Sequence, residues 1–137
     1  MAAATDSLTR VEIARLGELR GRLLHLHKML LELERQDYES RFGRVTTGEL
    51  LQLVVNNAQF AWLRIISGLL VEIDEVLNGE EAATSIDFEG LISQVRSLLT
   101  SSESEEFKSK YQAALQREPS VVMAHSDVMQ LLRQNHR

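Results

Sequence analysis

Five polar side chains fall at positions where a helical wheel places them among apolar neighbours. At about 100° per residue, three of them lie within the leucine arc of one segment, and the other two lie within the apolar arcs of two later segments. These residues are His27, Glu34, Tyr38, Asp74 and His125. Imidazole and carboxylate groups are common metal ligands, and a buried charge is costly unless it is paired or hydrogen-bonded. We therefore expect these groups to meet one another, to line a wet cavity, or to lie on faces that are less buried than the wheel implies.

Two interpretations of these residues stay open. In the first, they form a hydrogen-bonded polar layer that sets the register of the helices. In the second, His27, Asp74 and His125 converge from three helices on a divalent metal ion or a small ligand, because helical bundles build such sites from inward side chains. His27 and Glu34 are separated by roughly 10.5 Å along the helix axis, so these two side chains do not easily hold one small ion together.

The chain carries none of the local motifs of the common enzyme classes. It has no cysteine, which excludes disulfides, thiolate metal sites and cysteine nucleophiles. It also has no Glu-x-x-His or His-Glu-x-x-His pair, no Gly-rich phosphate loop and no Gly-x-Ser-x-Gly elbow. We therefore predict a protein that is not an enzyme and needs no cofactor, with a divalent metal as the alternative.

Charge and hydropathy restrict the expected partners and location. The chain has 20 acidic and 15 basic residues, a net charge of −5, and a nucleic-acid binder would need a basic face. Arg20 and Arg22 alternate with glutamates, which is typical of a solvated helix face. No apolar stretch approaches the roughly 20 residues of a membrane span, and no signal peptide is visible. We expect a cytoplasmic protein that binds neither nucleic acid nor membrane.

The segment that must position the first three side chains is a long helix. Thr9 and Glu12 fit a capping box, and Gly43 suits the end of a helix. A helix from about Thr9 to Phe42 would be roughly 50 Å long, so we expect the other elements to pack on it. Six leucines at alternating three- and four-residue intervals form its apolar stripe: Leu16, Leu19, Leu23, Leu26, Leu30 and Leu33.

The rest of the chain is also helical in pattern. Amphipathic or apolar segments cover residues 49–55, 58–77 and 86–99. A further segment begins with a capping box at Ser102 and Glu105, and a last one extends from Pro119 to about residue 133. No strand pattern is present. The sequence predicts an all-α fold, an antiparallel helical bundle of about five helices built on the long N-terminal helix. We expect one domain over residues 1–137, with residues 1–8 and 134–137 frayed.

Three stretches together resemble an uncharacterised family of small bacterial all-helical proteins. They are Leu26–Glu39, Phe60–Ser67 continuing through Ile73-Asp74-Glu75, and Val121–His125. The resemblance implies a bacterial, cytosolic, helical protein and carries no implication for chemistry. Several of the residues that carry it, His27 and Asp74 among them, are the inward polar positions found independently by the wheel.

The function that these observations favour is that of a structural or protein-interaction helical bundle. A helix of roughly 50 Å is long for the number of helices that this chain can pack against it. We therefore expect apolar surface on the first helix to be covered by a second copy in a homodimer. The alternative is a bundle that binds a metal or small ligand through His27, Asp74 and His125.

Overall fold

The computed structural model describes residues 7–79 and 83–134, which form six α-helices and one 3-10 helix. The α-helices are α1 (Arg10–Phe42), α2 (Thr47–Asn56), α3 (Arg64–Leu77), α4 (Ser85–Ser101), α5 (Glu105–Arg117) and α6 (Pro119–Gln134), and the 3-10 helix η2 (Ala58–Leu63) precedes α3. Within these residues the only β feature is an isolated bridge between Ser7 and Thr84. The all-α prediction is confirmed, and six α-helices stand where about five were expected.

The longest helix, α1, runs through the middle of the molecule. The predicted capping box is present: Thr9 Oγ1 accepts from the Glu12 N–H, and the Glu12 carboxylate accepts from the Thr9 N–H, both at 3.0 Å. Gly43 ends the helix with φ at +91°, a conformation that glycine adopts without strain. The six leucines of the predicted stripe are buried, none of them more than 8% exposed.

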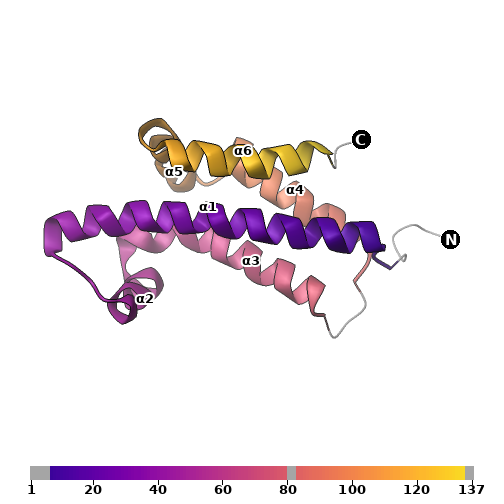
Figure 1. The fold of residues 1–137 in the computed structure, drawn as a ribbon, viewed down its shortest axis with the longest axis horizontal. Helices are drawn as coiled ribbons and strands as arrows, with labels where there is room; N and C mark the ends of the chain where they lie inside the picture. The colour runs from indigo at the N-terminus through magenta and orange to yellow at the C-terminus, as the bar shows by residue number, and fades with distance from the viewer. Residues whose placement is uncertain (1–6, 80–82, 135–137) are drawn as a thin grey trace.

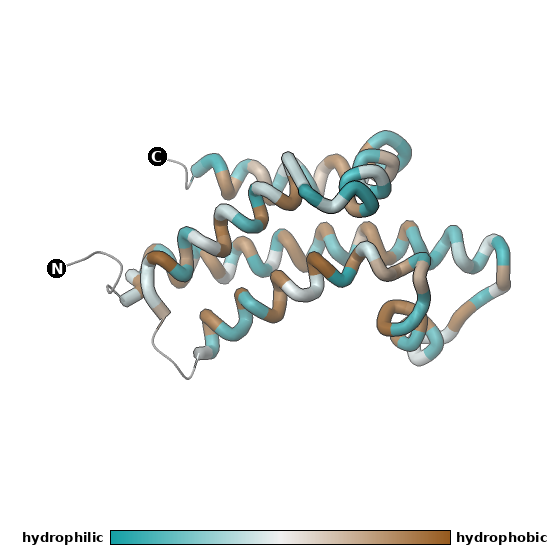
Figure 2. The backbone as a smooth tube through the Cα atoms, turned by 180° about the vertical axis from the view of Figure 1, so that it is seen from behind, coloured by the Kyte–Doolittle hydropathy of each residue, from teal (hydrophilic) through white to brown (hydrophobic). Residues whose placement is uncertain are grey.

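The other helices pack around α1. Both α3 and α6 run in the direction opposite to α1 (Figure 1). Seen from behind, α3 and α4 lie on the near side of α1, and hydrophobic and hydrophilic residues alternate along each helix (Figure 2). The beginnings of α1 and α4 are joined, because Leu8 N–H donates to the Ala83 carbonyl at 3.4 Å and Ser85 Oγ donates to the Glu12 carboxylate at 2.9 Å.

The hydrophobic core is built by every element except α2, which contributes no buried residue. An aromatic row joins η2 to α5: the ring centroids of Trp62 and Phe107 are 5.5 Å apart, and those of Phe107 and Tyr111 are 5.2 Å apart. In the described part of the chain no polar or charged residue is buried apart from the largely apolar Trp62 and Tyr111. The core is therefore apolar, and polar groups lie at its edges.

Two local predictions differ from the structure. The segment predicted as one helix over residues 58–77 begins as the 3-10 helix η2, because the Asn57 side chain caps the Gln59 N–H at 2.8 Å, and becomes α-helical only at Arg64. The N-cap of α5 is Ser104, whose Oγ accepts from the Phe107 N–H at 3.2 Å, instead of the predicted Ser102. The second difference arises where two serines compete for one cap.

The expected fraying of residues 1–8 and 134–137 concerns mostly residues outside the described ranges. Of the described ones, Ser7 forms the bridge to Thr84, and Gln134 is the last residue of α6. None of the helices in the described ranges combines the length and the apolar character that a bilayer crossing requires.

Candidate functional site

The five predicted site residues are all half-buried, at the edges of apolar faces. The wheel treated every apolar neighbour as buried. However, Val71 beside Asp74 is exposed, and Leu24 and Leu31, which bound the arc of α1, are only partly buried. The faces are thus less buried than the wheel implied, which was the third possibility left open by the sequence.

Three polar contacts join α1 to the η2–α3 segment at regular intervals, and we call them the polar ladder. The α1 members are Arg20, His27 and Glu34, each seven residues after the last. A seven-residue step is roughly 10.5 Å, so each contact lies two helical turns from the next. The three contacts are Arg20 with Asp74, His27 with Ser67, and Glu34 with Gln59 and Trp62.

The polar ladder records the register of two antiparallel helices. As the residue number on α1 rises by seven, the number of its partner falls from Asp74 to Ser67 and then to the η2 residues. Buried leucines of α1 occupy the positions between the contacts. A slip of one turn would separate all three contacts at once, and polar groups in a helical interface are a known means of specifying register. The ladder therefore selects one alignment of α1 and α3.

Glu34 makes the most extensive contact of the ladder. Its carboxylate accepts from Trp62 Nε1 at 2.7 Å and from Gln59 Nε2 at 2.8 Å, and Gln59 Nε2 also donates to the Glu34 carbonyl at 3.2 Å. A buried indole N–H needs an acceptor, and Trp62 is nearly fully buried. Glu34 therefore fixes the 3-10 helix on α1 at the point where Trp62 enters the core.

His27 and Asp74 form the other two contacts. His27 Nε2 lies 3.1 Å from Ser67 Oγ, and burial lowers the pKa of the His27 imidazole, which favours its neutral form. Asp74 forms an ion pair with Arg20 in which both side chains are about 40% exposed (41% and 39%). Such an exposed pair contributes little to stability, so its main effect is on alignment.

His125 lies outside the ladder, between α5 and α6. Its Nδ1 is 2.6 Å from the Tyr111 hydroxyl, and the two rings are tilted against each other with centroids 5.6 Å apart. Burial lowers the pKa of His125 and raises the pKa of Tyr111. The hydrogen bond and the ring contact of this pair link α5 to α6.

Tyr38 also lies apart from the other predicted residues. Its ring packs against Phe42, with centroids 4.7 Å apart, and against Phe60 at 6.1 Å. It belongs to an aromatic group at the C-terminal end of α1. Within the described ranges, no group of three or more His, Cys, Asp and Glu side chains is arranged to hold a metal ion. His27, Asp74 and His125 each contact a different partner.

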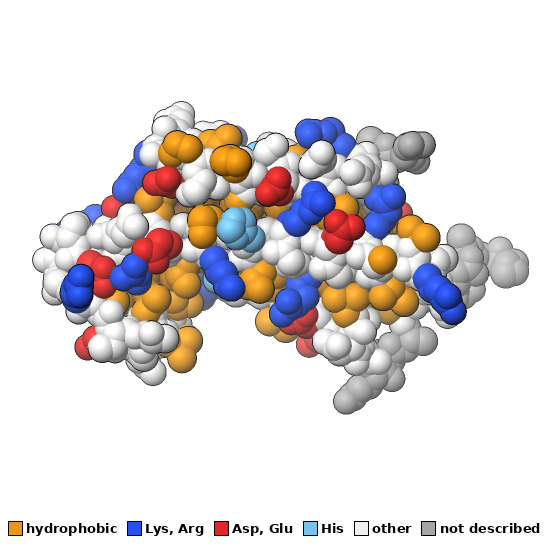
Figure 3. Space-filling model, viewed as in Figure 1, with side chains coloured by type: hydrophobic (Ala, Val, Ile, Leu, Met, Phe, Trp, Pro, Cys, Tyr) orange, Lys and Arg blue, Asp and Glu red, His pale blue; other side chains and the backbone are white. Residues whose placement is uncertain are grey.

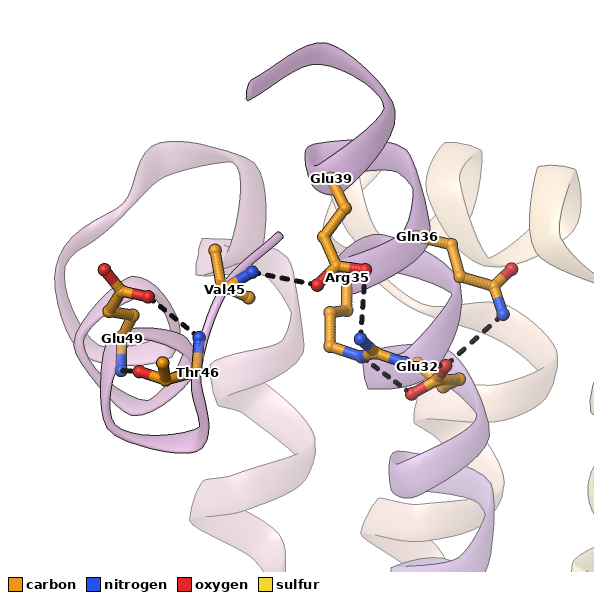
Figure 4. Close-up of polar contacts among 7 residues, drawn as sticks. All are labelled: Glu32, Arg35, Gln36, Glu39, Val45, Thr46 and Glu49. Atoms are coloured by element: carbon orange, nitrogen blue, oxygen red, sulfur yellow. Dashed lines mark hydrogen bonds and ion pairs between the residues drawn. The ribbon is translucent and has the colours of Figure 1, made fainter. Parts of the chain in front are cut away.

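A second polar network holds the connection between α1 and α2 (Figure 4). Glu39 accepts from the Arg35 guanidinium at 3.0 Å and from the Val45 backbone N–H at 2.9 Å. One residue later, Thr46 and Glu49 form the capping box of α2. The position of α2 is therefore fixed by hydrogen bonds at its start and by packing on η2, without burial of its own side chains.

Sequence reasoning missed three of the partners. Arg20 was assigned to a solvated face, and Tyr111 was not among the candidate residues. Arg117 was not singled out, although it forms a two-bond ion pair with Asp37 at 2.9 and 3.0 Å that joins α5 to α1 and lowers the pKa of Asp37. The seven-residue spacing shared by His27 and Glu34 and by Ser67 and Asp74 was the one signal that could have paired the helices.

No protein-family model matches the chain, and no curated protein or solved structure is significantly similar to it. The functional interpretation therefore rests on the geometry of the chain itself.

Proposed function

We propose that this protein is a non-catalytic helical bundle that acts as an interaction module and associates with a second copy of itself. The contact surface is the α2 face, which we define as Leu51 and Val55 on α2 together with Phe42 at the end of α1. The polar ladder aligns α1, which ends at Phe42, with the η2–α3 segment that follows α2.

The observation that carries the proposal is the exposure of α2. Five of its ten residues are Leu or Val, yet none of its residues is buried. Leu51 and Val55 are 62% and 58% exposed, and their spacing of four residues puts them on one face of the helix. Phe42 is 66% exposed. In Figure 3 hydrophobic side chains lie between α1 and α2 with charged side chains close to them, and further hydrophobic side chains lie elsewhere on this face. Apolar surface of this kind is typical of interaction sites.

Charge favours a second copy as the occupant. The only charged residue of α2 is Glu49, and its carboxylate is held by the capping box. In a two-fold interface the same surface meets itself, so a charged surface would repel its partner, whereas an uncharged apolar one would not. The side chains of the α2 face carry no charge themselves, and the Arg64 guanidinium beside the face donates to the Val55 carbonyl at 2.6 Å.

The proposed dimer contact lies on a different part of α1 from the leucine stripe that the sequence suggested. The sequence led us to expect a dimer along the long first helix, but the six leucines of its stripe are covered by the chain's own helices. A second copy could reach them only by opening the fold. Apolar side chains of α1 remain exposed at both of its ends: Val11 and Ile13 near its start are 62% and 46% exposed, and Phe42 at its end is 66% exposed. Only the C-terminal end leads into α2, where Leu51 and Val55 are also exposed.

The test is the solution mass of the protein, measured by light scattering after gel filtration. We expect about 31 kDa, twice the 15.5 kDa of one chain, at tens of micromolar. The double variant Leu51→Glu/Val55→Glu should have the mass of one chain. Its matched control, Val122→Glu/Met123→Glu on α6, adds the same charge to other exposed apolar residues and should keep the wild-type mass. A wild-type mass of one chain at 200 micromolar would overturn the proposal.

The alternative function, a metal or small-ligand site at His27, Asp74 and His125, has less support. Each of the three side chains has a hydrogen-bond partner of its own, and no metal-holding group is present in the described ranges. A thermal shift on adding zinc, nickel or manganese that disappears in His27→Gln and in His125→Asn would favour this alternative over the proposed interaction module.

A further inference from the structure

A groove lies between α3 and α4, on a different part of the molecule from the α2 face. Its volume is about 930 Å³. Its lining includes exposed apolar side chains, among them Val71 and Ile86, each 56% exposed. Carboxylates stand beside them, including Glu72, Glu75 and Asp87. We call this feature the α3–α4 groove.

The charge around the groove has one sign. Four of its described lining residues are acidic: Glu72, Asp74, Glu75 and Asp87. The described lining residues include no basic side chain. Asp74, which also lines the groove, is paired with Arg20, but in the described ranges no ion pair involves Glu72 or Glu75. The groove therefore presents uncompensated negative charge next to apolar surface.

The length of the groove suits a short helix. Its α3 side extends from Val71 to Asn78, roughly 10 Å, and its α4 side extends from Ile86 to Gln94, roughly 12 Å, at 1.5 Å per residue. Two turns of a bound helix cover that distance. An amphipathic helix that binds a groove anchors apolar residues at spacings of three, four and seven.

We propose that the α3–α4 groove binds a cationic amphipathic helix of a partner protein. Leu or Ile side chains on one face of that helix pack against Val71 and Ile86, and flanking Lys or Arg side chains pair with Glu72 and Glu75. Opposite charge across an interface speeds encounter and excludes wrong partners. The same surface of a second copy is a poor occupant, because two acidic rims would repel each other. This site therefore adds a partner that the α2 face does not provide.

The test uses a fluorescein-labelled 14-residue peptide of Leu and Lys with all leucines on one helical face, and measures its binding by fluorescence anisotropy. We expect saturable binding that weakens with salt and that falls at least tenfold in Glu72→Lys/Glu75→Lys. The control variant Glu103→Lys/Glu106→Lys changes the net charge equally at exposed positions away from the groove and should bind as the wild type does. Circular dichroism verifies that both variants are folded.

A second peptide separates groove binding from simple charge attraction. It has the same composition in an order that spreads the leucines around the helix, and we expect it to bind at least tenfold more weakly. Equal binding of the two peptides, or equal losses in the two protein variants, would overturn the proposal. The measurement is repeated on Leu51→Glu/Val55→Glu, where unchanged binding is expected, so its outcome is independent of self-association.

Discussion

Replacing Glu34 by Ala tests the polar ladder at its most extensive contact. The change removes the acceptor of the Trp62 indole N–H, at 2.7 Å, and of the Gln59 amide, at 2.8 Å. Trp62 is only 3% exposed, so water does not easily replace the lost carboxylate at the indole. A buried donor without a partner costs about 1–3 kcal/mol. Gln59 is half-exposed and can bond to water, so we expect a total loss of about 2 kcal/mol.

The assay is urea unfolding followed by circular dichroism, with Trp62 fluorescence as a second probe. Glu34→Gln keeps one acceptor oxygen and should lose no more than about 1 kcal/mol, the net value of one hydrogen bond. Glu18→Ala, which removes an exposed ion pair within α1, serves as the control and should lose less than about 0.5 kcal/mol.

A double-mutant cycle with Trp62→Phe completes the test. If the indole and the carboxylate contact each other as described, the double variant loses less than the sum of the single losses, by about 1–2 kcal/mol. Additive losses, or a Glu34→Ala loss as small as that of Glu18→Ala, would refute the reasoning that this contact fixes η2 on α1.

Three further predictions concern the same framework. Lowering the pH from 7.5 to 5.5 should reduce the free energy of unfolding measured by chemical denaturation. Burial lowers the pKa of His27 and His125, so below about 6.5 the unfolded chain binds protons that the folded chain does not. The double variant His27→Gln/His125→Asn should show a smaller dependence on pH. Asp74→Ala should lose at most about 1 kcal/mol by urea unfolding, because its ion pair with Arg20 is exposed, and a loss above about 2 kcal/mol would contradict this. Leu23→Ala should lose about 2–5 kcal/mol in the same assay, since Leu23 is 0% exposed in the core, and a loss below about 1 kcal/mol would mean that α1 is not central.

The long helix could be predicted from the sequence almost to the residue. Its start depends on the Thr9–Glu12 capping box and its end on Gly43, and both signals act within one turn of the chain. The leucine stripe identified its buried face for the same reason, because the periodicity of a helix is local. The two local errors were the 3-10 geometry of residues 58–63 and the cap of α5, where Ser102 and Ser104 could each serve.

The polar positions could be found, but their partners could not. A helical wheel shows which face a residue occupies, but it does not show which helix lies opposite. His27, Glu34 and Asp74 lie half-buried at the edge of the core, where the wheel had placed them within apolar arcs. Their convergence with His125 was expected without knowledge of the packing. Arg20 looked like part of a solvated face because its own helix offered glutamates, although its partner lies on α3.

The exposure of α2 could not be predicted from its sequence. A segment with five Leu and Val residues in ten is usually buried, and the pattern of Leu51 and Val55 does not differ from that of a core helix. Their exposure follows from tertiary structure, since α2 packs mainly on η2 and turns Leu50, Leu53 and Val54 toward the core, which leaves Leu51 and Val55 outside. This discrepancy between composition and burial is what supports the proposed interaction surface.

The most direct test of self-association is site-specific cross-linking, which is simple here because the chain has no cysteine. Single cysteines are introduced at Leu51, at Val55 and, as a control, at the exposed Gln130 of α6, and each variant is oxidised at tens of micromolar. We predict that Leu51→Cys or Val55→Cys forms a disulfide-linked dimer at least tenfold faster than Gln130→Cys, with circular dichroism unchanged. Equal rates at all three positions would contradict a dimer formed through the α2 face.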